Sequence, residues 1–254
     1  MGKLKILFSN LGYARGFNGY LKQHILHLYR HIYCPPNVQR QVLLELKNII
    51  NLKKPDIGCV VEIDQGSLNS AYFNQIEHLI DINYPFFDIE NKYSQNSYLN
   101  KLPIFNGKCN AFFAKLSLNY QKLYFTYGTK KLIYKINLIN NITLFFAHFS
   151  LKKNVRAKQY QEICALAKNE PGEVIIMGDF NNFLGFNELL PFTHDANLSI
   201  LNDQKIPTFT FHIWQYPIDL CICSSSLLRK LHLEIIPQPF SDHSALLLTI
   251  ASLP

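Results

Sequence analysis

The sequence lacks several features that define particular classes of protein. It contains no run of about 18 apolar residues, so no transmembrane helix is predicted. None of the six cysteines forms a Cys-x-x-Cys pair, which argues against a zinc site, and we expect buried thiols rather than a disulfide framework. No internal repeat, low-complexity tract or linker stands out, and we therefore expect one domain over residues 1–254.

The first residues also lack the features of a targeting signal. The apolar part of Met1 to Phe8 is too short for a secretory signal and is typical of a first strand. Ile6 stands where N-myristoylation of Gly2 would require Ser or Thr. We expect a cytoplasmic protein in a reducing compartment, although another route of export stays open.

The composition is that of a globular protein with a basic surface. Of the 254 residues, 48% are hydrophobic, which excludes a disordered chain and allows a substantial core. The net charge of +7 favours anionic partners. A basic surface that is merely solvated explains the same charge, so charge alone does not identify a partner.

Three segments show the apolar spacing of a helix. The first lies between Pro36 and Pro55, the second runs from Leu68 to Ile80, and the third covers Tyr160 to Ala167 and ends before Pro171.

Runs rich in β-branched and aromatic residues predict strands between and after these helices. The runs cover Lys5–Ser9, Ile57–Val61, Ala111–Lys115, Lys122–Tyr127, Lys131–Leu138, Ile142–His148, Glu173–Gly178, Ile218–Cys223, Leu231–Ile236 and Ala245–Ile250. Strands alternate with helices at first and then follow one another directly. This order predicts an α/β (α+β) arrangement of packed sheets with helices outside them.

Two polar motifs lie at the ends of predicted strands. Gly178-Asp179-Phe180-Asn181 follows the apolar run that ends at Met177, and Ser241-Asp242-His243 precedes the run that begins at Ala245. A carboxylate near a carboxamide, together with a carboxylate beside an imidazole, can bind a hard cation, orient a water and hold a phosphate. The pair therefore indicates metal-assisted hydrolysis of a phosphoester.

Four further polar residues lie at strand ends, and each also has a structural interpretation. Glu62 is either a metal ligand or an acid at a helix N-terminus before Ser67. Asn10 alone is typical of a turn, and His148 alone is typical of a hydrogen-bonded structural histidine. Asp219 enters an apolar strand and needs a partner. Placement of the whole set at strand ends favours a common site.

In this order, the polar residues resemble those of the endonuclease/exonuclease/phosphatase superfamily, whose fold is that of deoxyribonuclease I. The Gly-Asp-Phe-Asn and Ser-Asp-His motifs are together specific for it. Pro207-Thr208-Phe209 is similar to the family's Thr-Phe stretch, and Cys109-Asn110-Ala111 is similar to its Gly-Asn-Ala strand, with cysteine in place of glycine. The resemblance implies a four-layer sandwich of two packed mixed β-sheets flanked by helices.

The resemblance also implies a role for each polar residue. Mg²⁺, with Mn²⁺ as a substitute, would be bound by Asn10, Glu62 and Asp242. The catalytic residues would be Asp179, which orients or deprotonates the attacking water; Asn181, which holds a phosphate oxygen; His243, which acts on the scissile phosphate; Asp219, which fixes the tautomer of that histidine; and His148, which donates to a phosphoryl oxygen. Leu11 follows Asn10, so an acid that some nucleases of the family carry there is missing.

The superfamily includes nucleases, inositol-polyphosphate phosphatases and sphingomyelinases, so the resemblance does not choose a substrate. Basic clusters at Lys130-Lys131, Lys152–Lys158 and Arg229-Lys230 suit a nucleic acid, and we expect a monomeric nuclease. The alternative is a phosphatase or phospholipase C-like enzyme that acts on an anionic phospholipid (a phosphoinositide), an inositol phosphate or a sphingolipid. A second alternative is a non-catalytic binding protein on the same fold.

The segment from Gly12 to Asn37 is rich in aromatic and basic residues. Contact with a substrate and simple packing with solvated charge both explain it, and packing is favoured. A lipid with a neutral headgroup would require an exposed apolar loop. Residues 186–192 and 212–214 are the candidates for such a loop, and we expect both to lie in the core.

Overall fold

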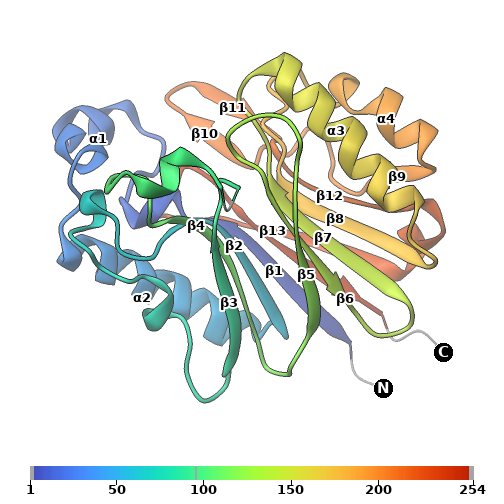
Figure 1. Cartoon of the computed structure of the whole chain (residues 1–254), viewed down its shortest axis with the longest axis horizontal. Coiled ribbons are helices and arrows are strands. Elements are labelled where there is room, and N and C mark those ends of the chain that lie inside the picture. The colour runs from blue at the N-terminus through green and yellow to red at the C-terminus, as the bar shows by residue number, and fades with distance from the viewer. Residues whose placement is uncertain (1–2, 95, 252–254) are drawn as a thin grey trace.

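The apolar runs of the sequence form two six-stranded mixed β-sheets that pack against each other (Figure 1). The structure is a computed structural model that describes residues 3–94 and 96–251. The strand order in the first sheet is Leu231–Ile236 (β13), Ala245–Ile250 (β14), Leu4–Asn10 (β1), Ile57–Asp64 (β2), Lys108–Ala114 (β4) and Phe86–Asn91 (β3). The order in the second is Asn119–Tyr124 (β5), Leu132–Asn137 (β6), Ile142–His148 (β7), Glu173–Asp179 (β8), Asp219–Ser224 (β12) and Leu198–Ile200 (β9).

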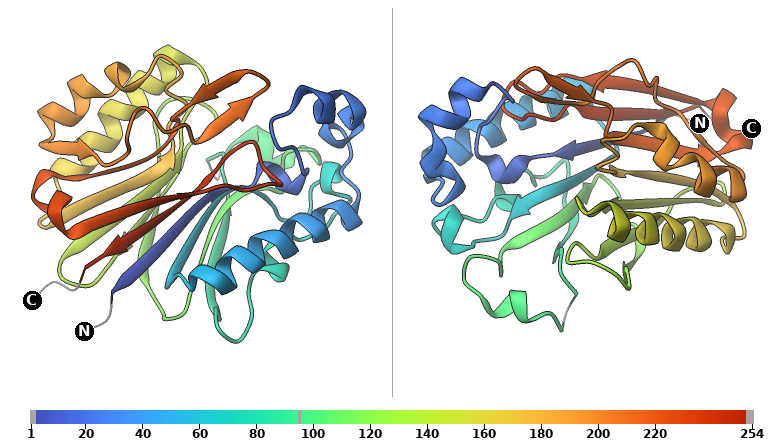
Figure 2. Two further views of the ribbon diagram at one scale, coloured as in Figure 1. Left: turned by 180° about the vertical axis from the view of Figure 1, so that it is seen from behind. Right: turned by 90° about the horizontal axis from the view of Figure 1, so that it is seen from above.

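Helices cover the outer faces of both sheets, so the four-layer sandwich predicted from the sequence is confirmed (Figure 2). The α-helices are Leu21–Leu26 (α1), Pro36–Lys53 (α2), Lys153–Lys168 (α3) and Leu190–Asp195 (α4). Short 3₁₀ helices cover Gly12–Ala14 (η1), Leu28–His31 (η2), Leu68–Ser70 (η3), Ile76–His78 (η4), Tyr98–Lys101 (η5), Phe186–Glu188 (η6) and Ser225–Lys230 (η7). In the described part of the chain, no helix has the length and apolar character needed to cross a membrane.

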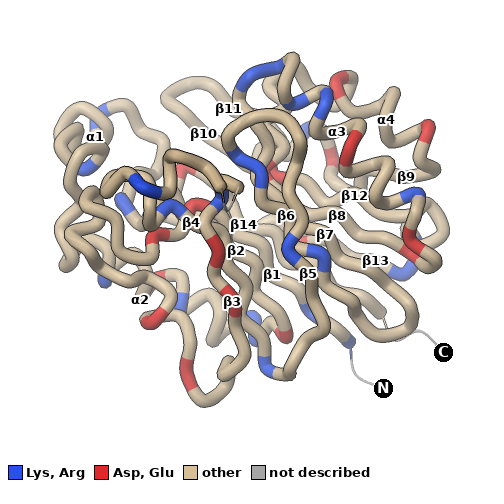
Figure 3. The backbone as a smooth tube through the Cα atoms, in the orientation of Figure 1, with Lys and Arg blue, Asp and Glu red and all other residues tan. Residues whose placement is uncertain are grey.

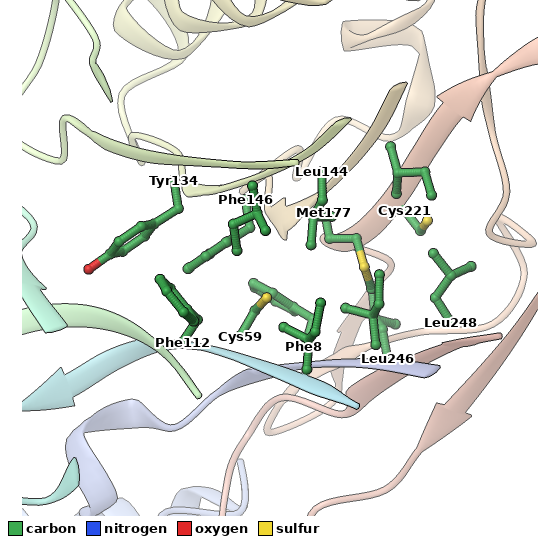
Figure 4. Close-up of a cluster of buried hydrophobic side chains, with 14 of the residues drawn as sticks. Phe8, Cys59, Phe112, Tyr134, Leu144, Phe146, Met177, Cys221, Leu246 and Leu248 are labelled. Atoms are coloured by element: carbon green, nitrogen blue, oxygen red, sulfur yellow. The ribbon is translucent and has the colours of Figure 1, made fainter. Parts of the chain in front are cut away.

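The main core lies between the two sheets (Figure 4). Phe8 and Phe112 of the first sheet pack there with Tyr134, Phe146 and Met177 of the second. Burial of these side chains from both sheets supplies the hydrophobic driving force that holds the layers together. All six cysteines are buried and free, as the sequence predicted.

Parallel pairing within each sheet places the predicted site residues at one edge of the sandwich. β1 and β2 are parallel, with Asn10 opposite Val61, and β7 and β8 are parallel, with His148 opposite Asp179. The carboxyl ends of parallel strands meet at the same edge of a sheet, which is where open α/β sheets place their sites.

The second predicted helix is wrong. The segment from Leu68 to Ile80 forms two separate 3₁₀ turns, η3 and η4, although Ile76 and Leu79 are buried as an apolar stripe would require. Ala71 and Tyr72 both have positive φ, at 53° and 58°, which ends the helical conformation between the two turns. The apolar residues have the spacing of a helix, but the backbone between the two turns is not helical.

The expectation that residues 212–214 lie in the core is also wrong. They form the turn and first residue of a separate two-stranded hairpin, Phe209–Phe211 (β10) and Trp214–Tyr216 (β11), which the sequence did not predict. Ile213 is 73% exposed and Trp214 is 57% exposed, since this hairpin belongs to neither large sheet. In the other candidate loop, Phe186 and Leu189 are buried as expected, whereas Leu190 is 49% exposed.

Candidate active site

All eight predicted site residues lie at the edge of the sandwich where β1, β2, β7 and β8 end. The eight are Asn10, Glu62, His148, Asp179, Asn181, Asp219, Asp242 and His243. Hydrogen bonds and ion-pair distances of 4.0 Å or less link each of them to at least one other member of the set. The strand ends therefore bring residues far apart in the sequence into one cluster.

Asp179 joins the two sheets within this cluster. Its Oδ2 accepts a hydrogen bond of 3.0 Å from Asn10 Nδ2 in the first sheet and lies 3.1 Å from His148 Nε2 in the second. Its Oδ1 accepts a hydrogen bond from the backbone N–H of Asn181. Burial raises the pKa of this carboxyl, but His148, a donor at 3.1 Å, outweighs burial, so the pKa of Asp179 lies below its usual range. The group is therefore a carboxylate at neutral pH.

Asp219 and His243 form a second pair beside Asp179. His243 Nδ1 lies 2.8 Å from Asp219 Oδ2, which fixes the ring and leaves Nε2 on the other side, 3.3 Å from Asn10 Nδ2. Burial lowers the pKa of His243, but the carboxylate of Asp219 raises it above its usual range. Thr208 holds the start of this strand, because its Oγ1 accepts from the backbone N–H of Asp219.

Glu62 and Asp242 face a cavity of about 100 Å³ that His243 also lines. Glu62 lies at a β-bulge of β2, with a φ of 54°, and this kink turns its carboxylate out of the regular strand. The nearest charged partners of its Oε1 are His148 Nδ1 at 3.8 Å and Lys92 Nζ at 3.9 Å, both beyond hydrogen-bond distance. The carboxylate thus keeps lone pairs for a ligand in the cavity.

Asp64, rather than Glu62, is the acid that caps the following turn. Its fully buried carboxylate accepts from the backbone N–H of Ser67 at 2.6 Å and from Ser70 Oγ at 2.9 Å, and it pairs with Lys108 Nζ at 2.6 Å. The role of an acid that stabilises the turn at Ser67, which was one interpretation of Glu62, therefore belongs to Asp64.

Two lysines of the cluster were not predicted as site residues. Lys130 Nζ contacts His148 Nε2, and Lys92 Nζ contacts the hydroxyl of Tyr13 beside Glu62. Burial lowers the pKa of Lys92 to about 7, although Glu62 opposes that shift. Lys130 belongs to a dibasic pair that the sequence shows, but nothing in the sequence distinguishes it from Lys131.

The lysines and His148 set the charge of Glu62. Burial and the nearby Lys130 lower the pKa of His148 to about 4, so the imidazole is neutral at pH 7. Burial raises the pKa of Glu62, but His148, Lys92 and Lys130 together lower it to about 2. Glu62 is therefore ionised over the whole physiological range, as a cation ligand must be.

Two overlapping sets of donors suit a divalent cation. Glu62 and Asp242 supply carboxylate oxygens to one cavity, with the amide of Asn10 close by, and oxygen donors of this kind are what Mg²⁺ prefers. Donor atoms of Asp179, Asp219 and His243 also lie within 4.8 Å of one another. Asn10 and His148 already engage the carboxylate of Asp179, and Asp219 and His243 already pair with each other, so we consider the first set better suited to the ion.

Comparison with protein families identifies one match that covers most of the chain. The model of the Endonuclease/Exonuclease/phosphatase family matches residues 37–243. A sequence search of curated proteins gave no match.

Solved structures with the same fold cover almost the whole chain. The D. rerio TDP2 complexed with single strand DNA product superposes with a TM-score of 0.66 at 15% identity, covering 99% of this chain and 100% of that chain. The human Nocturnin catalytic domain with bound sulfate anion gives 0.63 at 16% identity, covering 98% and 94%. The endonuclease domain of TRAS1, a telomere-specific non-LTR retrotransposon, gives 0.60 at 14% identity, covering 98% and 99%. At these identities the likeness establishes the fold alone.

Asp64 has a structural role, whereas Glu62 faces the cavity, so we expect replacement of Asp64 to lower stability. Asp64→Ala should lower the free energy of unfolding by about 3–5 kcal/mol, because Lys108 would remain buried without its partner. Urea denaturation measures this change. The matched control is Asp195→Ala, which removes an exposed ion pair with Lys168 and should leave stability unchanged. Equal stability of the two variants would contradict the structural role of Asp64.

Proposed function

We propose that this chain, which belongs to the Endonuclease/Exonuclease/phosphatase family, hydrolyses a phosphoester with Mg²⁺ as its cofactor. The observation that carries the proposal is the network around Asp179. It joins Asn10, His148 and the Asp219–His243 pair beside a cavity that Glu62 and Asp242 line. Buried acids and imidazoles with strongly shifted pKa values, gathered at one cavity, are typical of catalytic sites.

Glu62, Asp242 and Asn10 are the residues that we propose to hold the metal, and Mn²⁺ would be accepted in place of Mg²⁺. The fit rests on Glu62, which is ionised, faces the cavity and has no charged partner closer than 3.8 Å. A bound divalent cation supplies positive charge to a phosphoryl oxygen and lowers the pKa of a bound water.

The hydrolysis forms a bond between the water oxygen and phosphorus and breaks the ester bond between phosphorus and the leaving oxygen. We propose that Asp179 orients the attacking water and accepts its proton. His243, held by Asp219, would return a proton to the leaving oxygen through Nε2. Lys130, which contacts His148, would attract the phosphoryl oxygens as their charge increases.

The remaining two residues would position the phosphate. The amide of Asn181 donates one N–H to the backbone carbonyl of Phe149 at 3.0 Å, and its second N–H is the donor that we propose for a phosphate oxygen. The ring of His148 lies between Glu62 and Asp179, and its Nδ1 is buried without a hydrogen-bond partner in the described structure. Because Nε2 donates to Asp179, Nδ1 of the neutral ring is an acceptor, and we propose that it holds a water beside the phosphate.

Two classes of substrate fit this chemistry. A nucleic acid is supported by the net charge of +7 and by the DNA product bound to D. rerio TDP2, a structural neighbour. The phosphoester of a lipid is supported by a different observation, the exposure of apolar residues such as Ile213 and Trp214 near the site. A non-catalytic binding protein is the third interpretation, and it would be favoured if the protein did not bind Mg²⁺.

Replacement of Glu62 tests the metal site. Glu62→Gln should weaken Mg²⁺ binding about tenfold or more and abolish hydrolysis, because the neutral amide lacks the charge of the carboxylate. Isothermal titration calorimetry and an activity assay measure the two effects. Glu90→Gln is the matched control, since its side chain has the same 22% exposure and pairs with Lys122 outside the site. Full activity of Glu62→Gln would remove this residue from the metal shell.

Adjacent lysines provide a second matched test. Lys130→Ala should lower the rate of hydrolysis about 100-fold, because an amine that contacts His148 is lost from the site. Lys131→Ala should have no such effect, since the Nζ of Lys131 donates to the backbone carbonyl of Thr126 at the surface. Steady-state kinetics on both variants measures the difference, and similar rates would assign Lys130 a structural role only.

A further inference from the structure

Two segments near the site expose an unusual number of large apolar side chains. One comprises α1 and η2, and the other is the β10–β11 hairpin. Six residues, which we call the apolar rim, carry most of this surface: Ile25, Leu26, Leu28, Ile32, Ile213 and Trp214. Each is at least 57% exposed. Exposed apolar side chains gathered in this number on a folded protein indicate an interaction site.

The two segments contact each other although they are far apart in the sequence (Figure 2). The ring of His24 packs edge-on against Phe211 at 5.2 Å, and the backbone N–H of His212 donates to Gly19 O at 2.7 Å. The Cβ of any other residue at position 19 would lie 2.0 Å from Thr210 O, so glycine permits this approach. These contacts place the two segments that carry the rim side by side.

The apolar rim adjoins the mouth of the catalytic cavity. Phe17 and His24 line that cavity together with Glu62 and His243, and the ring of Phe209 in the hairpin lies 4.8 Å from the ring of His243. A partner that covers the rim therefore also lies at the entrance of the cavity. A protein bound to the rim would close this entrance, whereas a lipid bilayer bound there would bring its headgroup phosphates to the cavity.

The charges on the rim segments suit an anionic bilayer. Residues 16–33 contain Lys22 and Arg30 and no acid, and residues 206–216 contain no charged residue at all (Figure 3). Five of the six rim residues are aliphatic and offer no face on which a nucleobase can stack, so stacking at the rim is limited to Trp214, and a bilayer fits the surface better than a nucleic acid does. Exposed aliphatic residues, with Trp and Tyr among them and sparse cations, are instead typical of segments that lie in a membrane interface.

We infer that the apolar rim inserts into the headgroup region of a lipid bilayer and that the substrate is the phosphoester of a membrane lipid. Lys22 and Arg30 would attract anionic headgroups. The headgroup phosphate would enter the cavity beside Glu62 and His243. This inference rests on the proposed phosphoester hydrolysis for its substrate, but the membrane docking does not depend on it.

Vesicle co-sedimentation without added metal tests the docking. The wild-type chain should bind vesicles of phosphatidylcholine with phosphatidylserine. The double variant Ile213→Ser/Trp214→Ser, which we call the rim variant, should bind them at least about tenfold more weakly. The double variant Lys22→Gln/Arg30→Gln should bind these vesicles only as tightly as vesicles of phosphatidylcholine alone, because it loses the attraction to the anionic headgroups. Ile82→Ser and Leu52→Ser are the controls, because Ile82 and Leu52 lie outside the rim and are 93% and 76% exposed. Both control variants should bind vesicles as the wild type does.

Three results would overturn the docking: no binding of the wild type to vesicles, equal vesicle binding of the rim and control variants, or a rim variant that loses binding of single-stranded DNA while its vesicle binding is unchanged. Hydrolysis assays with Mg²⁺ then test the substrate. The rim variant should hydrolyse a soluble phosphodiester at the wild-type rate and vesicle phospholipids far more slowly. Binding of vesicles without hydrolysis of their lipids, while the soluble ester is cleaved, would overturn the lipid substrate alone. Failure to cleave either would instead count against the proposed hydrolysis.

Discussion

Burial of the Asp179 carboxylate between the two sheets is the constraint on which the rest of the site depends. An unpaired carboxylate there would be very costly, so the fold must bring donors to it. Asn10 arrives from the first sheet and His148 from the second, and both can reach Asp179 only if β1, β7 and β8 end at the same edge. The packing of the sheets and the assembly of the site are thus one structural requirement.

The sequence predicted the parts of the fold that depend on regular apolar patterns. The helix after Pro36 was predicted from the helical spacing of its apolar residues, and the strands that end at Asn10, His148 and Asp179 were predicted from continuous runs of β-branched and aromatic residues. The segment from Leu68 to Ile80 could not be predicted in the same way. Its two turns are set by the hydrogen bonds of Asp64 and by positive φ at Ala71 and Tyr72, which apolar spacing does not reveal.

Residues of the site were predictable where the sequence places a polar motif at a strand end, as for Asp179 and His243. Lys130 was not predictable, because it differs from Lys131 only in which side chain contacts His148. Trp214 was misplaced for a related reason, since an apolar residue in a small separate hairpin looks like a core residue in sequence. The contact of Lys130 with His148 and the exposure of Trp214 both depend on tertiary packing, which the sequence pattern does not show.

Hydrolysis by wild type and Asp179→Asn, with Mg²⁺ or with a chelator, tests the central claim most directly. The panel should contain single- and double-stranded DNA, RNA, inositol phosphates, phosphoinositides and sphingomyelin. We predict turnover of one substrate class by the wild type with Mg²⁺, and its loss both in the chelator and in Asp179→Asn, whose amide cannot accept the proton of the attacking water. Turnover by Asp179→Asn at the wild-type rate would contradict the account.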